Sequence, residues 1–136
     1  MQDLKKRTFL FAVVVAKLIQ ALPYNIINRV YFNQIIKSSS SIGVNYRAAR
    51  RAKSDADFLN KLKIVEEETD ETIYFLELLF EFNPEHQENI LSLINEGTEI
   101  LKIIVASINT VREKIIQKNN SYFVPRTLYF MCVNFT

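Results

Sequence analysis

The chain has 136 residues, 49% of them apolar, and a formal net charge of +2, which favours a single domain with a sizeable core. With only 2 Gly, 3 Pro and no Trp it contains few chain breakers, so we expect few turns and long elements, and the composition favours helix over strand. A single cysteine, Cys132, excludes an intramolecular disulfide and gives no sign of an oxidising compartment.

The first predicted helix runs from about Leu4 to Ala21. Asp3 can cap its start, and Pro23 ends it because proline disfavours helical backbone in the residue before it. Apolar residues recur at steps of three and four, which favours helix although three consecutive valines lie among them. We expect its core-facing stripe to consist of Phe9, Ala12, Val13, Ala16 and Ile19.

The same segment begins with basic residues followed by an apolar run, as a signal peptide does. The run, 9–16, is too short to span a bilayer, Lys17 follows it, and no small-residue cleavage site appears. We therefore expect no signal peptide or membrane anchor, and a cytoplasmic location.

The second predicted helix runs from about Asn25 to Ala52 and contains four consecutive serines, 38–41. The serines resemble a loop by composition, but apolar residues keep helical spacing across them: Ile35, Ile36, Ile42 and Tyr46. We predict one long helix whose small side chains let a neighbouring helix approach closely. The alternative is a break near Gly43.

The two later helices carry heptad seams, with apolar or small residues at alternating steps of four and three. The third helix opens at Ser54 or Asp55 and stops at Asn83, with the seam Phe58, Leu62, Val65, Thr69, Thr72, Leu76 and Leu79. The fourth runs from about Glu85 to Lys118, with the seam Ile90, Ile94, Gly97, Leu101, Ile104, Ile108, Val111 and Ile115. Glycine inside this seam predicts a close approach between helices at that point.

Short loops between the helices make sequential helices antiparallel neighbours. The predicted fold is therefore all-α, an antiparallel up-down-up-down four-helix bundle over residues 1–120, followed by a C-terminal extension. We expect residues 121–136, SYFVPRTLYFMCVNFT, to form an irregular aromatic tail. Packing of this tail on the bundle, pairing with another chain and disorder all stay open.

Charge is segregated along the chain. Residues 1–63 carry 12 Lys and Arg against 3 Asp and Glu, whereas residues 64–136 carry 5 against 12. Such asymmetry can steer an acidic partner to the basic half. The alternative is that the two halves attract each other, within one bundle or between subunits.

A search for chemistry gives no catalytic, metal or cofactor site. His86 is the only histidine, so the acidic run at 66–71 lacks the second histidine that a di-iron bundle site requires. Phosphate-binding and nucleophile-elbow motifs are absent from the sequence. The serines at 38–41 have no histidine partner, and Cys132 has no evident activator. We therefore predict that the protein is not an enzyme.

Two basic clusters remain. One ends the second helix and the other opens the first: Arg47, Arg50, Arg51 and Lys53, and Lys5, Lys6 and Arg7. Cations at a helix end suit its dipole, but cations at a helix start do not, and arginine suits phosphate through bidentate hydrogen bonds. In an up-down bundle the two clusters lie at the same pole. Nucleic acid, a protein or subunit contact, and plain solvation stay open as explanations.

The segment 38–79 resembles the bacterial four-helix bundle proteins, also called 23S rRNA intervening-sequence proteins. The matching positions are Ser41, Ile42, Gly43, Asn45, Asp57, Phe58, Lys61, Leu62, Glu67, Glu71, Thr72, Leu76, Leu78 and Leu79. Weaker similarity runs from about 9 to 118. Phe75 stands where the family often has Trp, and the tail after Asn120 has no family counterpart.

The resemblance implies a bundle that assembles as a ring, with a pentamer expected. The family includes the accessory protein of diversity-generating retroelements, which binds nucleic acid and a reverse transcriptase, although membership does not transfer that role. Combining this with the basic clusters, we predict a non-enzymatic, homo-oligomeric accessory or scaffold protein that binds RNA or DNA. The alternative is a structural protein–protein interaction module without nucleic-acid binding.

Overall fold

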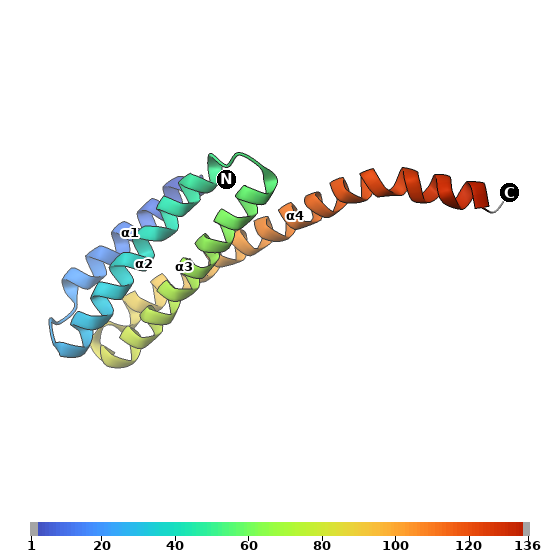
Figure 1. Ribbon diagram of the computed structural model, residues 1–136. Helices are drawn as coiled ribbons and strands as arrows, with labels where there is room; N and C mark the ends of the chain where they lie inside the picture. Colours follow the sequence, from blue (N-terminus) through green and yellow to red (C-terminus); the bar gives the residue numbers. More distant parts are fainter. Residues whose placement is uncertain (1–2, 135–136) are drawn as a thin grey trace.

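The computed structural model describes the backbone of residues 3–134 and the side chains up to residue 121, and this part of the chain contains helices but no strand. The helices are α1 (Leu4–Ala21), α2 (Ile26–Arg50), α3 (Asp55–Phe82), the short 3-10 helix η1 (Pro84–His86) and α4 (Gln87–Asn134). The four long helices lie side by side and α4 continues beyond the others (Figure 1). The all-α four-helix bundle is confirmed.

The starts of the first three helices are fixed by side-chain caps. The backbone N–H of Lys5 donates to Asp3 Oδ1 at 3.1 Å, and the N–H of Asn28 donates to Asn25 Oδ1 at 2.9 Å. The N–H of Asp57 donates to the Ser54 hydroxyl at 3.1 Å. Each cap satisfies a backbone donor that has no partner within its helix, so the predicted starts agree with the structure.

The serines of α2 are part of an unbroken helix that packs against α3. Ser38 and Ser39 are buried, and the hydroxyl oxygens of Ser38 and Thr72 lie 2.8 Å apart across the α2–α3 contact. Small side chains at this point let the two helices approach closely, as the sequence predicts. The alternative, a break near Gly43, does not occur.

Both predicted seams face the core. In α3 the whole predicted seam is buried except for the half-buried Phe58, and Ile73 joins it. In α4 the buried face differs from the predicted seam at two positions, each by one residue. Leu93 and Ile100 are buried, whereas Ile94 and Leu101 are half-buried.

The predicted core face of α1 is wrong. The buried face is Thr8, Phe11, Val15, Leu18 and, just after the helix, Leu22. Phe9 belongs to the predicted stripe and is 55% exposed. The helix is apolar on nearly every side, so periodicity alone could not select the face that packs. The buried residues do follow steps of three and four, as in the other seams.

At Gly97, α4 packs closely against α3 and α1. A Cβ added there would lie 3.0 Å from Ile73 Cγ1 in α3 and 3.2 Å from Phe11 Cζ in α1. The predicted close approach is therefore present, and it accounts for a glycine in the middle of a helix despite its cost in helix propensity of about 1 kcal/mol.

We expect Gly97→Leu to lower the free energy of unfolding by about 1–3 kcal/mol, because the added side chain has to displace Ile73 and Phe11. Urea unfolding followed by circular dichroism measures the change. Asn95→Leu, at an exposed position of the same helix, is the matched control and should change stability by less than about 0.5 kcal/mol. Equal effects of the two substitutions would contradict the close approach.

At the end of the bundle where α1 connects to α2, two buried asparagines join the start of α2 to the end of α3. Asn28 Nδ2 donates to Asn83 Oδ1 at 2.7 Å, and Asn83 Nδ2 donates to Asn28 Oδ1 at 3.0 Å. Each amide also donates to a backbone carbonyl, Asn28 to Pro23 O and Asn83 to Leu79 O. The pair therefore ties the α1–α2 connection to the turn between α3 and α4.

The extension after the bundle differs from the expected irregular tail, since α4 is helical through Asn134. After residue 97 the chain has no further glycine. Proline lacks an N–H donor and its ring crowds the preceding turn of a helix, but the helix continues past Pro125. The side chains after residue 121, and with them Cys132, lie outside the described residues, and the division into two domains at residue 120 stays a prediction. Within residues 3–134, no helix is long and apolar enough to cross a lipid bilayer.

Candidate functional site

Six of the seven predicted cationic residues gather at one end of the bundle. The start of α1 and the end of α2 meet there, beside the turn that leads into α3 (Figure 1). We call this end the basic pole and define it by Lys5, Lys6, Arg47, Arg50, Arg51 and Lys53. All six side chains are exposed, and none forms an ion pair within the described residues. The predicted merging of the two clusters is therefore present.

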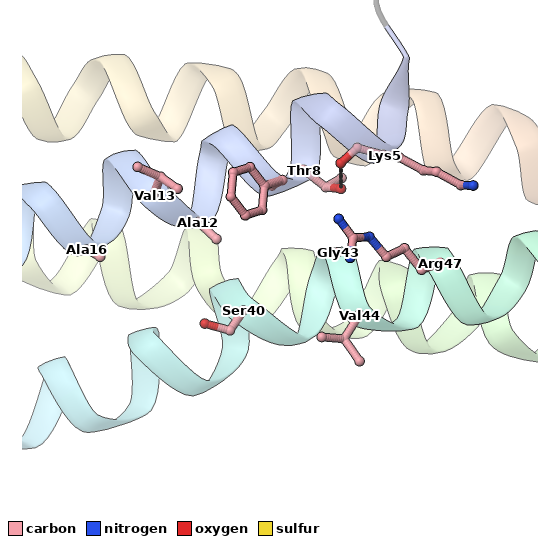
Figure 2. Close-up of a pocket in the computed structure, with 10 residues that line it drawn as sticks. Lys5, Thr8, Ala12, Val13, Ala16, Ser40, Gly43, Val44 and Arg47 are labelled. Atoms are coloured by element: carbon pink, nitrogen blue, oxygen red, sulfur yellow. Dashed lines mark hydrogen bonds between the residues drawn. The ribbon is translucent and has the colours of Figure 1, made fainter.

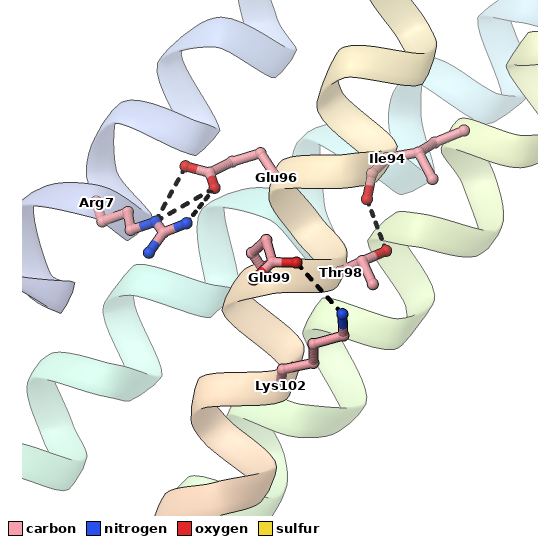
Figure 3. Close-up of polar contacts among 6 residues, drawn as sticks. All are labelled: Arg7, Ile94, Glu96, Thr98, Glu99 and Lys102. Carbon is pink, nitrogen blue, oxygen red and sulfur yellow. Dashed lines mark hydrogen bonds and ion pairs between the residues drawn. The ribbon is translucent and has the colours of Figure 1, made fainter.

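The seventh residue, Arg7, points elsewhere. Its guanidinium binds both carboxylate oxygens of Glu96 in α4, with Nη2 to Oε1 at 2.6 Å and Nε to Oε2 at 3.1 Å (Figure 3). These hydrogen bonds raise the pKa of Arg7 above its usual value. Arg7 therefore holds α1 against α4 and does not belong to the basic pole.

Helix α4 adds basic residues that the sequence prediction did not place at this end. Lys118 Nζ donates to Asp55 Oδ2 at 2.7 Å, and Lys114 Nζ lies 3.7 Å from Asp55 Oδ1. The hydrogen bond from Lys118, with the charge of Lys114 beside it, holds the pKa of Asp55 below its usual range. The predicted antiparallel packing of α3 and α4 could have placed Lys114 and Lys118 at this end of the bundle.

The basic pole opens into two hollows. Arg50 and Lys53 line one of about 510 Å³, together with Asp55 and Lys118. Lys5 and Arg47 lie at the end of the other, a groove of about 430 Å³ between α1 and α2 (Figure 2). We call this second hollow the α1–α2 groove. Its apolar or small lining residues are Phe9, Ala12, Val13 and Ala16 of α1 and Ser40, Gly43 and Val44 of α2.

The α1–α2 groove contains most of the α1 residues that the sequence prediction assigned to the core. Four of its five residues, all but Ile19, line the groove instead of the core. Phe9 is 55% exposed and Val44 opposite is 67% exposed. An apolar surface of this kind is typical of a docking site.

Charge segregation along the chain is sharper than the division into halves suggests. Residues 4–54, which form α1 and α2, contain ten Lys and Arg and no acidic residue, whereas residues 64–101 contain eleven Asp and Glu and no Lys or Arg. Among the described ion pairs, only Arg7–Glu96 joins these two segments. Direct ion pairing between the two segments therefore involves one residue of each.

Comparison with known proteins identifies the family. The model of the 23S rRNA-intervening sequence protein family matches residues 2–106. The chain belongs to this family. A solved structure of a protein of unknown function from the S23 ribosomal protein family of Bacteroides thetaiotaomicron VPI-5482 is similar, with 37% sequence identity and a TM-score of 0.69 over 78% of this chain and 98% of that chain. A comparison with curated proteins gave no match.

The basic pole and the α1–α2 groove both lie within the part that matches the 23S rRNA-intervening sequence protein family, whereas Lys114, Lys118 and the extension of α4 lie after it. The family resemblance read from the sequence is confirmed. The further link to the accessory protein of diversity-generating retroelements stays a prediction.

In residues 3–121, no group of three or more His, Cys, Asp and Glu side chains is placed to hold a metal ion. Partial burial, together with the neighbouring carboxylates of Glu71 and Glu67, raises the pKa of Glu68. That the protein is not an enzyme stays a prediction.

Proposed function

We propose that this protein is a non-enzymatic, homo-oligomeric accessory or scaffold protein that binds nucleic acid through its basic pole. The observation that carries the proposal is the gathering of six exposed cations, without an ion pair among them, at one end of the bundle. Repetition of this pole in an oligomer, with a pentamer expected from the family resemblance, would multiply weak contacts into useful affinity.

Helix capping alone does not account for the pole. Arg47 and Arg50 lie in the last turn of α2, where the helix dipole favours a cation. Lys5 and Lys6, however, lie in the first turn of α1, where the dipole disfavours one. Phosphate groups bound across both helix ends would stabilise all of these charges at once, and arginine binds them through paired hydrogen bonds.

The geometry favours contact with the phosphate backbone over base reading. The cations are spread over the ends of two helices and do not project from one helix face that could enter a DNA groove. We therefore expect affinity for RNA or DNA that falls steeply with salt and depends weakly on sequence.

Simultaneous reversal of Arg47, Arg50 and Arg51 to Glu should lower nucleic-acid affinity roughly tenfold or more and flatten its salt dependence. Fluorescence anisotropy with labelled RNA and DNA at low and moderate salt measures both. The matched control reverses Lys17, Arg29 and Lys102, which are exposed and lie away from the pole, and changes net charge equally. Absence of binding at low salt, or an equal loss in the control, would end the proposal.

A second candidate function is a protein-interaction module without nucleic-acid binding. It is favoured by the segregation of ten basic residues in 4–54 from eleven acidic residues in 64–101. In that case the basic surface would meet an acidic protein, and a reverse transcriptase is the partner that the family resemblance suggests. A monomeric mass together with no captured partner would count against this candidate.

A further inference from the structure

The α1–α2 groove has an apolar middle that the proposed nucleic-acid contact does not use. Phe9 and Val44 are more than half exposed on its two sides, and Lys5 and Arg47 lie only at its end (Figure 2). Phosphates would contact that end but would leave the apolar middle in water. The middle of the groove therefore calls for a different, partly apolar occupant.

Small residues in the lining of this groove allow a helix to approach it. Ala12 and Ala16 of α1 both line it, and their short side chains let the backbone of a third helix come close. α1 and α2 also already approach each other closely here, since a Cβ on Gly43 would lie 3.3 Å from Thr8 Oγ1. The occupant should be acidic beside its apolar residues, because residues 4–54 contain no acidic residue to repel it.

The same chain presents such a helix face on α3. Ile64, Glu67, Glu71 and Tyr74 follow one another at steps of three and four, so they share one outward face. Ile64 is 41% exposed, Tyr74 is 57% exposed, and both glutamates are exposed. Neither glutamate forms an ion pair within the described residues. We call these four residues the α3 stripe.

We propose that the α1–α2 groove of one copy receives the α3 stripe of a second copy. Apolar side chains then cover each other, and the acidic stripe meets a surface without acidic residues. Because the two surfaces differ, a pair of copies leaves one groove and one stripe unfilled, and the contact repeats into a closed ring or an open chain. The inference rests on the homo-oligomeric part of the proposed function and assigns its contact surfaces.

A mixing experiment tests the pairing. Val44→Glu places an acidic group in the groove, and Tyr74→Lys places a basic group in the stripe, so each variant alone should be monomeric by light scattering. An equimolar mixture should form a 1:1 dimer, because the intact stripe of the first variant fits the intact groove of the second. Val105→Glu, at an exposed apolar position of α4 outside both surfaces, should leave the mass of the assembly unchanged.

The outcomes separate this inference from the proposed function. If the unchanged chain assembles but either variant keeps the same mass, or if the mixture stays monomeric, the pairing of groove and stripe is overturned while the basic pole is unaffected. If the variants behave as expected but the unchanged chain binds no nucleic acid, the pairing stands and the nucleic-acid proposal falls. A monomeric unchanged chain would overturn both the pairing and the assembly. Circular dichroism of each variant confirms that it is folded.

Discussion

Phe11→Ala is expected to lower the free energy of unfolding by about 3–5 kcal/mol, whereas Phe9→Ala should lower it by less than about 1 kcal/mol. The two phenylalanines are two residues apart in α1, but Phe11 is 2% exposed and Phe9 is 55% exposed. Truncation of Phe11 opens a cavity beside Gly97, because a Cβ on Gly97 would lie only 3.2 Å from Phe11 Cζ. Truncation of Phe9 removes a side chain that is half in water.

Chemical denaturation measured at two protein concentrations checks this pair. If Phe9 contributes only to contact between copies, its small effect should depend on protein concentration, whereas the effect of Phe11 should not. Equal losses for the two alanine variants, or a larger loss for Phe9, would show that α1 packs through its other face. The pair therefore tests the orientation of α1 on which the α1–α2 groove depends.

Asn28→Ala and Asn83→Ala should each cost about 2–3 kcal/mol of stability. Removal of either amide leaves the Oδ1 of the other without its partner and one N–H of its Nδ2 unpaired, while that Nδ2 still donates to a backbone carbonyl. Both residues are almost fully buried. An unpaired buried donor or acceptor costs more than the net value of the hydrogen bond it made. Asn33→Ala, at an exposed position of α2, is the matched control and should have little effect.

The double variant distinguishes a mutual pair from two independent residues. Because either single substitution already breaks both hydrogen bonds between the amides, the double variant should lose clearly less than the sum of the single losses. Urea titration of the unchanged chain, the two single variants and the double variant measures these losses. Additive losses would contradict a coupled pair and would assign the effects to packing alone.

Helix positions and most of the core were predictable from the sequence because polar residues separate the apolar ones in α3 and α4. In α3, for example, Glu66, Glu67 and Glu68 lie between Val65 and Thr69, so only one face can be buried. In α1, by contrast, Phe9, Leu10 and Phe11 are consecutive, and any of them could face the core. The orientation of α1 depends on the surface of α4 around Gly97. The periodicity of α1 carries no information about that surface.

The candidate site was predictable in its position but not in all of its members. Antiparallel topology alone brings the start of α1 to the end of α2, and the basic pole follows from it. The pairing of Arg7 with Glu96 depends on which of many acidic residues lies opposite, 89 positions away. The α1–α2 groove was missed because its α1 residues were assigned to the core.

The lack of any acidic residue in 4–54 has a consequence for how the chain reaches its structure. During synthesis, α1 and α2 are made before α3 and α4. Residues 4–54 then carry ten positive charges without the acidic residues of the later helices as neighbours. Their mutual repulsion and the uncovered sides of Phe11 and Ile35 disfavour a stable hairpin of the two. We therefore expect ordered packing of α1 and α2 to occur only after α3 and α4 have been synthesised.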